Sequence, residues 1–348
     1  MKTLLSKFIL SGVLLSLLLS SWLYGLVTQF LYSPINLSEH YGDEIVVTIR
    51  AGTSFKALSW QLYDKEIIKY PRILVAYARI SGQTKIKMGE YSITKKDVPR
   101  SLLEKFNQGD VVQHSITLPE GWSFKQMVDE IGQIDQFAED SLLHTLSLLT
   151  LANIQVEHPE GWFYPDTYSY TSTDSIADLL ARAHDKMVRV LDAEWSLRAP
   201  DLPYTEPYEA LIMASIIEKE TGLPSERKQI AGVFVRRLQA GMRLQTDPTV
   251  IYGMGDDYQG NIRRSDLKRV TPYNTYRING LPPTPIAMPG REAINAALNP
   301  EVGSSLYFVA RGDGGHYFSD TLDEHNRAVQ KYQIEQRAKN YQSVPNQN

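Results

Sequence analysis

The chain has 348 residues, with 36 Lys and Arg against 40 Asp and Glu, and it contains no cysteine. This length allows two domains with a sizeable core beyond any N-terminal segment. The near balance of charge leaves no basic footprint for a nucleic-acid partner. The lack of cysteine excludes disulfides, thiolate metal sites and cysteine nucleophiles. The sequence also lacks phosphate-loop and dinucleotide fingerprints and any His pair at helical zinc spacing, so we expect no metal and no cofactor.

The first informative segment is an uncharged, largely apolar run over residues 8–32, preceded by Lys2 and Lys7. As a helix, this run is long enough to cross a hydrocarbon core of ~30 Å. We therefore predict a single-pass anchor in the inner (cytoplasmic) membrane, with residues 1–7 in the cytoplasm and the rest of the chain in the periplasm. The alternatives are a cleaved signal peptide, which favours a shorter core and an A-x-A site, and a buried core helix.

A small α+β module is expected over residues 40–110. Its pattern predicts, in order, a strand from Glu44 to Ile49, helices over 55–62 and 71–79, a strand over 86–93 and a helix over 99–106. Residues 48–56 also align with residues 117–125, because each segment has a strand, a Gly turn, a Ser N-cap and then Phe. Either a common strand–turn–helix unit occurs twice, or the first copy opens a glycan-binding βααβ unit that resembles a LysM module.

A larger α+β catalytic domain is expected over residues 111–337, followed by a flexible tail over 338–348. Its predicted elements are helices over 140–151 and 175–197, a helix capped by Thr205 and running to Thr221, a helix from Ser225 to the Gly241 stop, a structureless segment over 271–290, a hairpin of 306–310 with 316–318, and a capping box of Thr321 with Glu324. A proline-rich segment of twenty residues inside a compact domain is usually functional.

Glu218 is the candidate acid. It is the first charge after an apolar helical run and shares a stripe with Leu211, Ala214 and Ser215. Burial and the negative end of the helix both raise the pKa of a carboxyl group placed there. A glutamate that stays protonated near neutral pH is what a general acid requires. The alternative is a solvated Glu-Lys-Glu sequence at a helix end, with Lys219 offsetting the dipole.

Three segments are dense in amides, hydroxyls and aromatic rings, the groups that bind sugars: residues 160–168, 245–249 and 271–276. The candidate substrate-binding residues in them are Tyr164, Asp166, Gln245, Thr246, Asp247, Tyr273, Asn274 and Tyr276. Polar turns have the same composition, Trp162 is also a candidate core residue, and Asp166 and Asp247 are also candidate structural caps.

Together, several motifs resemble the YceG-like family in order and approximate spacing. They are EGWFYPDTY at 160–168, ASIIEKET at 214–221, LQTDPT at 244–249, PYNTY at 272–276 with GLPP at 280–283, and LYFVA at 306–310 with GH at 315–316. The resemblance covers about residues 1–335. Two departures occur: Arg236 stands where the pattern has Asn, and Thr284 interrupts a Pro-Pro-Gly-Pro pattern.

The resemblance implies a lytic transglycosylase that cleaves the β-1,4 bond between N-acetylmuramic acid and N-acetylglucosamine inside peptidoglycan strands without water as nucleophile. Glu218 matches the family's catalytic glutamate, and Gln245, Tyr273 and Asn274 are the residues we expect to position the substrate. An enzyme anchored in this way would trim nascent strands beside penicillin-binding-protein synthases, its possible partners, and so limit strand length.

Two rival functions remain open at this stage. One is a hydrolytic muramidase that uses Glu218 with Asp247 or Asp166, since a hydrolase normally needs a second carboxylate ~5–9.5 Å away. The other is a non-catalytic peptidoglycan-binding scaffold for cell-wall synthases.

Overall fold

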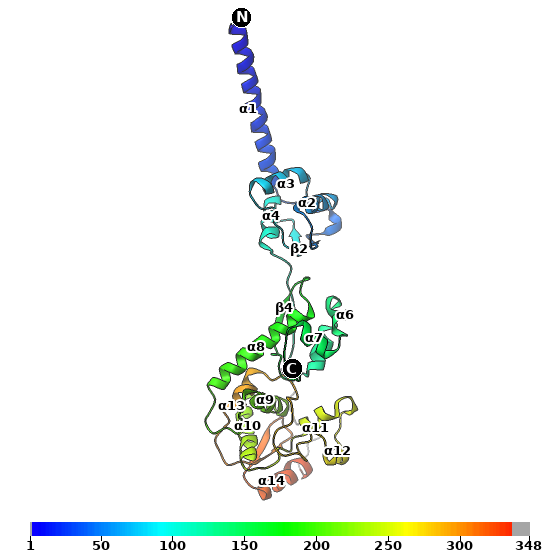
Figure 1. Ribbon diagram of the computed structural model, residues 1–348, viewed down its shortest axis with the longest axis vertical. Coiled ribbons are helices and arrows are strands. Elements are labelled where there is room, and N and C mark those ends of the chain that lie inside the picture. Colours follow the sequence, from blue (N-terminus) through cyan, green and yellow to red (C-terminus); the bar gives the residue numbers. More distant parts are fainter. Residues whose placement is uncertain (1, 336–348) are drawn as a thin grey trace. The chain divides into compact units, whose positions relative to one another are not determined.

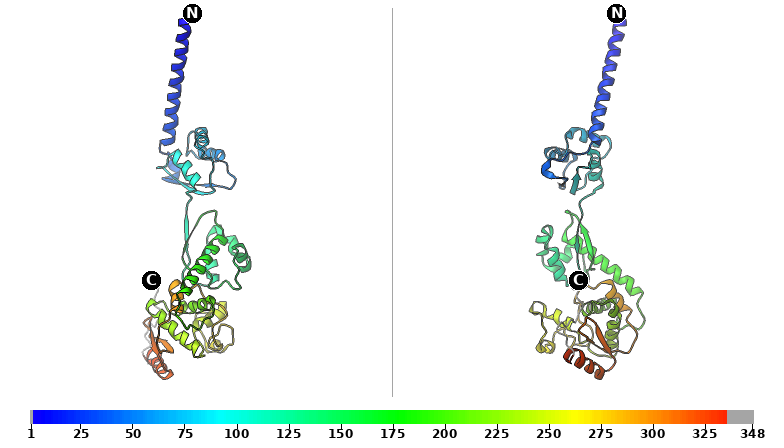
Figure 2. Two further views of the ribbon diagram at one scale, coloured as in Figure 1. Left: turned by 60° about the vertical axis from the view of Figure 1, so that its left-hand side comes forward. Right: turned by 180° about the vertical axis from the view of Figure 1, so that it is seen from behind.

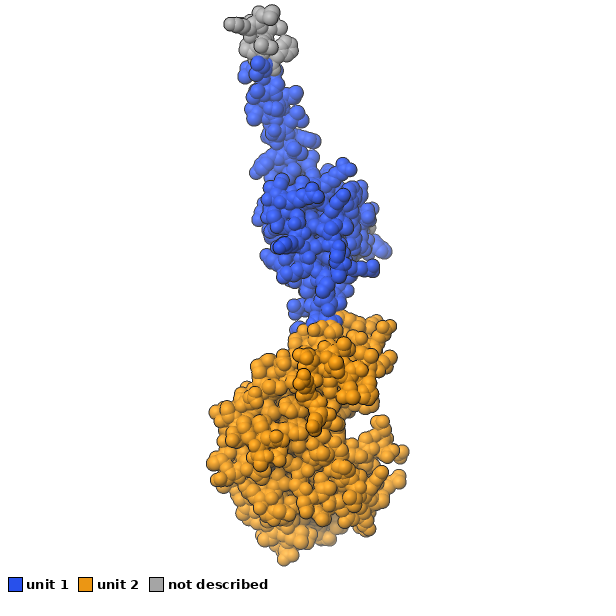
Figure 3. All heavy atoms as spheres, in the orientation of Figure 1, with its two compact units in different colours: residues 1–114, 169–174 blue, residues 115–168, 175–348 orange. Residues whose placement is uncertain are grey.

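A computed structural model describes residues 2–335 of the chain (Figure 1). The chain forms two compact units, which Figure 3 colours separately. Unit 1 comprises residues 1–114 and 169–174, and unit 2 comprises residues 115–168 and 175–348. The predicted flexible tail at 338–348 lies outside the described residues. The mixture of helices and strands confirms the predicted α+β class in its coarse form.

Helix α1 (Lys2–Tyr32) is the predicted apolar helix, and its segment Ile9–Tyr32 is long and apolar enough to cross a membrane. Its last turn packs into unit 1, where Leu31 is buried. The Phe30 ring lies 5.5 Å from the Tyr70 ring, edge to face, and the Arg100 guanidinium lies 5.4 Å from the centre of the Tyr32 ring. The apolar helix is thus continuous with the folded module and compatible with a single-pass anchor.

The remainder of unit 1 follows the predicted strand–helix–helix–strand order. Its elements are η1 (Glu39–Tyr41), β1 (Glu44–Ile49), α2 (Phe55–Asp64), α3 (Pro71–Ile80), β2 (Gly89–Thr94) and α4 (Pro99–Gln108). Strands β1 and β2 are antiparallel, with Val47 opposite Tyr91. Alternate residues of β1 are buried, as expected for a two-stranded sheet with one face on a core. Strand β2 begins at Gly89, three residues later than the predicted start at 86, and Gly109 ends α4 with φ +79°.

The predicted repeat is present as local structure. In the first copy Gly52 (φ +77°) follows β1, and the Ser54 hydroxyl caps α2. In the second copy Gly121 (φ +77°) follows β3 (His114–Thr117), and Ser123 caps α5 (Phe124–Ile131). Strand β3 pairs with β4 (Thr167–Tyr170) in a two-stranded sheet. The Gly turn of the second copy contributes to the candidate active site.

Unit 2 is mainly helical (Figure 2). After α5 its elements are η2 (Asp135–Phe137), α6 (Ala138–Ser141), α7 (Thr145–Leu151), α8 (Ile176–Ser196), α9 (Pro207–Glu220), α10 (Pro224–Gln239), α11 (Asp247–Met254), η3 (Gly255–Asp257), α12 (Arg264–Lys268), α13 (Arg291–Leu298), β5 (Tyr307–Ala310), β6 (His316–Ser319), α14 (Leu322–Val329) and the π-helix η4 (Gln330–Glu335). Antiparallel β5 and β6 confirm the predicted hairpin, and the Thr321–Glu324 capping box is present.

Helix α9 lies at the centre of the unit 2 core. Every residue from Ala210 to Ile217 is buried, and helices α8, α10, α11 and α13 all pack against it. A helix that is apolar on all sides has no free face and must be enclosed. The predicted burial of the stripe that leads to Glu218 is therefore confirmed.

Two predicted helix starts were wrong for the same reason. Helix α9 begins at Pro207 with Glu206 as N-cap, while the Thr205 hydroxyl donates to Glu209 (2.8 Å) instead of capping. Helix α10 begins at Pro224, not at Ser225. Proline has a fixed φ and no N–H, so it fits the first helical position, where a backbone N–H would lack an intrahelical partner. The helix predicted over 140–151 is also two helices, interrupted at 142–144.

The segment 271–290 contains no helix or strand, as predicted, and it is fastened to α9. The backbone N–H of Ile286 donates to the buried Ser215 hydroxyl (2.9 Å), which itself donates to the Ile212 carbonyl (2.7 Å). The loop that bears much of the site is thus held by a side chain of the central helix.

We predict that Ser215→Ala lowers the free energy of unfolding by about 1–3 kcal/mol, because it leaves the buried N–H of Ile286 without a partner. Chemical denaturation would measure the change. Ser196→Ala is the matched control, since the exposed Ser196 hydroxyl bonds only to a carbonyl three residues earlier (2.7 Å) and its loss should be nearly neutral. Equal effects of the two substitutions would contradict this role for Ser215.

Candidate active site

Glu218 lies in the last turn of α9, and its side chain is only 7% exposed. One carboxylate oxygen accepts a hydrogen bond from the backbone N–H of Gly290 (2.9 Å). The other lies 3.5 Å from the guanidinium of Arg227, on α10. A buried carboxyl group is thus held between a backbone donor and a cation.

The cover over Glu218 comes from the second strand–turn–helix copy. The N–H of Gly121 donates to the carbonyl of Met288 (2.9 Å), and the N–H of Met288 donates to the carbonyl of Trp122 (2.8 Å). The Lys219 ammonium donates to the carbonyl of Gly121 (3.1 Å). Two segments far apart in sequence are therefore joined above the end of α9, and together they exclude water from the carboxyl group.

Arg227 is shared among three carboxylates. Its side chain is 10% exposed and lies 3.5 Å from Glu218 and 3.8 Å from Glu120, and it forms an ion pair with Glu292. Glu120 and Glu292 are 46% and 66% exposed, so water screens their charges, whereas Glu218 is 7% exposed and depends on the surrounding protein. Arg227 Nε is also a buried donor without a protein partner among the described residues.

The pKa of Glu218 is raised above its ordinary value of 4.5. Burial is the main cause, and the Glu120 carboxylate adds to it, while the Gly290 N–H, Arg227 and Lys219 act in the opposite direction. Arg227 alone would lower the pKa at this distance. The pKa of Glu218 is raised nevertheless, because burial outweighs these opposing interactions. Glu218 is thus an acid that can hold a proton and can later be stabilised as a carboxylate.

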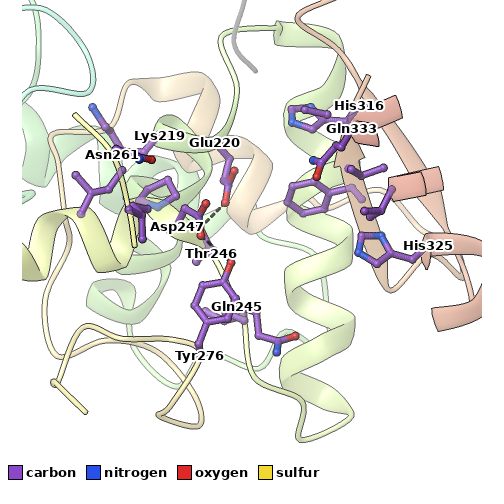
Figure 4. A pocket seen from close by; sticks show the side chains of 18 of the residues that line it. Lys219, Glu220, Gln245, Thr246, Asp247, Asn261, Tyr276, His316, His325 and Gln333 are labelled. Carbon is purple, nitrogen blue, oxygen red and sulfur yellow. Dashed lines mark hydrogen bonds between the residues drawn. The ribbon is translucent and has the colours of Figure 1, made fainter. Parts of the chain in front are cut away.

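A cleft of about 780 Å³ adjoins this site, and the residues after Glu218 line it (Figure 4). The Thr246 hydroxyl donates to Glu220, and the Tyr276 hydroxyl donates to Asp247 (2.7 Å). Further lining residues come from the hairpin β5–β6 and from α14, with His316 and His325 among them. Glu218 is not itself a lining residue. Lys219 connects the two places, since it lines the cleft and holds the loop that covers Glu218.

Four of the predicted substrate-binding residues line the cleft: Gln245, Thr246, Asp247 and Tyr276. Gln245 has φ +56°, an uncommon conformation for a residue other than Gly, and its side chain accepts from Arg237 (3.3 Å). Thr246 is 2% exposed, so its hydroxyl is shielded from solvent and binds Glu220. Gln245 and Asp247 are exposed. The structure thus places these four candidates together on one wall.

Tyr273 and Asn274 are not among the residues that line the cleft. Asn274 is 1% exposed, and its amide donates to three carbonyls, of Asp266 (3.1 Å), Leu267 (3.2 Å) and Arg269 (2.6 Å). An amide occupied in this way shapes the loop and has no free edge for a sugar in this conformation. The Tyr273 hydroxyl is bonded to that of Thr284 (2.9 Å), the residue that departs from the family pattern.

Tyr164 and Asp166 lie elsewhere. The pKa of Tyr164 is raised, mainly by burial and then by the Glu120 carboxylate, and the backbone of Arg291 lowers it, so its hydroxyl lies near the Glu218 site and not in the cleft. Asp166 forms an ion pair with Lys186 on α8. The charge of Asp166 is therefore already compensated.

A family model described as the YceG-like family matches residues 47–331. The chain belongs to the YceG-like family. An endolytic murein transglycosylase of Bacillus subtilis (strain 168) is 29% identical over 334 residues, covering 90% of each chain. One of Streptococcus pneumoniae (strain ATCC BAA-255 / R6) is 26% identical over 364 residues, covering 93% of this chain and 65% of that protein. A crystal structure of a YceG-like protein from Listeria monocytogenes is 33% identical, with a TM-score of 0.51, and covers 82% of this chain and 99% of that chain.

Several residues of this YceG-like site were missed by sequence reasoning. Arg227 and Glu292 belong to no motif that was singled out in the sequence, and Glu120 lies in the repeated segment 117–125 without a sign of its proximity to Glu218. Glu160 and Glu220 were noticed only as parts of motifs, although burial raises the pKa of each to about 7. Among residues 2–335, no group of three His, Asp or Glu side chains is placed to hold a metal ion.

We predict that Glu120→Gln lowers the pKa of Glu218, because it removes a negative neighbour and leaves Arg227 with fewer carboxylate partners. A titration of isotope-labelled glutamate carboxyl carbons by NMR would measure the shift. Glu130→Gln, on the exposed face of α5, should leave the pKa of Glu218 unchanged. A rise in that pKa, or no change, in Glu120→Gln would contradict the arrangement.

We predict that the buried Glu160 makes the free energy of unfolding depend on pH. It is 3% exposed and accepts hydrogen bonds from the Phe124 N–H (2.9 Å) and the Tyr252 hydroxyl (3.0 Å). Its folded pKa of about 7 exceeds the ordinary value of 4.5, so its contribution to stability is full below pH 4.5 and is lost as pH rises through about 7. At about 1.4 kcal/mol per pKa unit, this loss is on the order of 3 kcal/mol.

Glu160→Gln should therefore reduce the fall in the free energy of unfolding between pH 5 and pH 8, measured by urea denaturation at each pH. Glu139→Gln, an exposed change on α6, should keep the wild-type pH dependence. A pH dependence in Glu160→Gln as steep as in the wild type would show that Glu160 does not titrate as proposed.

Proposed function

We propose that this chain is a membrane-anchored endolytic peptidoglycan lytic transglycosylase. The observation that carries the proposal is the buried Glu218, whose pKa is raised and which lies beside a cleft walled by amides, hydroxyls and rings. Membership of the YceG-like family supports it, as do relatives named endolytic murein transglycosylase. The proposed bond is the β-1,4 link from N-acetylmuramic acid to N-acetylglucosamine within a glycan strand.

In the proposed mechanism Glu218 acts first as acid and then as base. Its proton moves to the bridging oxygen as the bond from that oxygen to the anomeric carbon breaks, and the N-acetylglucosamine leaves with a new hydroxyl. The carboxylate then takes the proton of the muramoyl C6 hydroxyl, whose oxygen bonds to the anomeric carbon and closes a 1,6-anhydro ring. The proton count balances, Glu218 ends protonated, and no water is consumed.

The surroundings of Glu218 suit both halves of this cycle. Burial favours the protonated form before bond cleavage. The Gly290 N–H and the Arg227 guanidinium stabilise the carboxylate in between. The unpartnered Nε–H of Arg227 leaves one donor for a substrate oxygen or a water molecule. The site therefore needs no second carboxylate in a direct chemical role.

Glycan binding is proposed for the wall of the cleft. Gln245 and Asp247 are exposed there, and Tyr276 offers a ring face beside them. Thr246 would act through Glu220, which it holds by a hydrogen bond. Tyr273 and Asn274 would act by shaping the loop that carries Tyr276, and Tyr164 by packing near Glu120. Asp166 keeps a structural role in the ion pair with Lys186.

The N-terminal helix supports a proposed location at the cytoplasmic membrane. Lys2 and Lys7 favour an N-terminus in the cytoplasm, which would place both units on the outer side, where peptidoglycan is made. The strand–helix–helix–strand module of unit 1 is proposed to act as a LysM-like glycan contact. An enzyme held there would meet nascent strands beside their synthases, which are its proposed partners, and would limit strand length.

Glu218→Gln is predicted to lower the rate of strand cleavage at least about 10²-fold, because the amide can accept from Gly290 but cannot donate a proton to the leaving oxygen or remove one from C6. Purified glycan strands would be digested and 1,6-anhydro ends counted by mass spectrometry. Glu206→Gln, an exposed change at the start of the same helix, should retain wild-type activity. Cleavage at the normal rate by Glu218→Gln would reject this acid.

A hydrolytic muramidase is the second candidate, and Glu120 is the observation that favours it. This carboxylate shares Arg227 with Glu218 and is 46% exposed, so it is available to orient a water molecule. Digestion in heavy-oxygen water separates the two functions. We expect no label at the new muramoyl ends, and labelled reducing ends would establish hydrolysis. Wild-type protein that binds sacculi and releases nothing would instead establish a scaffold.

A further inference from the structure

Unit 1 has a basic groove between helices α2 and α3 that no part of the proposed reaction uses. Its lining residues are Lys56, Trp60, Arg72, Val75, Ala76 and Arg79. Lys56 and Trp60 are one turn apart on α2, and Arg72 and Arg79 are two turns apart on α3, so each helix presents one face to the groove. None of the six lining residues is acidic.

The three cations of this groove are exposed and have no carboxylate partner among the described residues. Two other cations of the same unit do have carboxylate partners: Lys95 lies 2.9 Å from Asp43, and Lys105 lies 2.9 Å from Asp97. Clustered cations repel one another and are maintained at some cost unless an anion lies nearby in the functional state. The groove therefore has charge complementarity to an anionic partner.

Helix α2 and the two ends of α3 also carry exposed apolar side chains, of which Trp60 lines the groove. Trp60 is 37% exposed, Tyr70 is 46% exposed and Ile80, at the end of α3, is 87% exposed. Trp and Tyr beside Lys and Arg are the composition of surfaces that lie in the headgroup region of a bilayer, where ring and cation both find partners. A soluble polyanion would satisfy the charges but would leave Ile80 in water.

The location of the groove points to the same partner. The Glu66–Tyr70 loop, which leads into α3, faces the last turns of α1 across a cavity of about 300 Å³ that Leu26, Gln29 and Phe30 also line. Figures 1 and 2 show α3 beside the C-terminal end of α1, with the strands of unit 1 further away. Because Ile9–Tyr32 is the apolar span, the start of α3 lies at the level where that span ends.

We propose that the α2–α3 groove docks unit 1 onto the anionic surface of the bilayer that α1 spans. Lys56, Arg72 and Arg79 bind phospholipid phosphates, and Trp60 lies among the headgroups. The anchor then has two attachments, one through the bilayer and one along its surface, so that unit 1 cannot rotate freely about α1. This inference rests on the anchor of the proposed function and does not depend on the chemistry of Glu218.

The chain lacks cysteine, so one introduced thiol gives a single labelling position. The full-length protein would carry a fluorophore through Ala76→Cys in the groove or, as control, through Gln108→Cys, an exposed position at the end of α4 that faces away from Pro99, where α4 meets α1. Each would be placed in nanodiscs of phosphatidylcholine with or without phosphatidylglycerol, with a nitroxide-headgroup lipid as quencher.

We expect the label at position 76 to be quenched strongly in anionic discs, weakly in neutral discs and weakly in high salt, and the label at position 108 to be quenched weakly throughout. Removing each cation should lower the docked-to-undocked ratio about fivefold, so Arg72→Glu with Arg79→Glu should abolish the difference between lipids. Lys96→Glu, a charge reversal in the turn after β2, should not. Circular dichroism would confirm that the variants fold.

Equal quenching at positions 76 and 108 would contradict the proposed docking. Quenching at position 76 that does not depend on lipid charge would contradict it as well. Protein that fails to copurify with the discs would overturn the anchor itself and the docking with it. Strand cleavage by the detergent-solubilised protein is a separate readout that neither result decides, so failure of the docking and failure of the proposed function are distinguishable.

Discussion

The site depends on the burial of Glu218, whose side chain is 7% exposed at the end of α9. Arg227 is the cation nearest to Glu218, and it also faces Glu120 and Glu292. Burial raises the pKa of Glu218 although Arg227 lies beside it, and the same guanidinium can stabilise the carboxylate once the proton has left.

Helix α9 places two different carboxyl groups at one end. Residues two apart on a helix point about 200° apart, so Glu218 and Glu220 face opposite sides of the same turn. Glu218 faces Arg227 and Gly290, whereas Glu220 faces Thr246 and the cleft. Lys219, between them, fastens the loop of Gly121 that covers the acid. The residues that follow Glu218 therefore line the cleft, while Glu218 itself lies beneath the loop that Lys219 fastens.

Each of the two units has its own hydrophobic core, and the two cores have different consequences. Unit 2 excludes water around one side chain, which requires the dense core about α9. Unit 1 has a separate core, in which Leu31 at the end of the apolar helix is buried with residues of the module. The apolar helix is therefore part of a folded unit. In the proposed docking, the basic groove of unit 1 would add a second attachment to the membrane and limit the rotation of this unit about α1.

Local patterns in the sequence determined many elements of this protein, because helix caps, turns and apolar periodicity depend on residues that are close together in the sequence. The apolar span, the Ser54 and Ser123 caps, the burial of α9 and the identity of Glu218 as candidate acid all follow from composition and period. Only tertiary structure decided what surrounds that acid. Glu120 comes from a distant segment and Arg227 from the next helix, and neither carries a sequence signal that places it beside Glu218. Asn274 is a residue type that binds sugars, but it is buried and its amide donates to three carbonyls at the end of α12. The burial of a side chain and the charges around it depend on all residues that lie near it in space. A short stretch of sequence does not contain those residues.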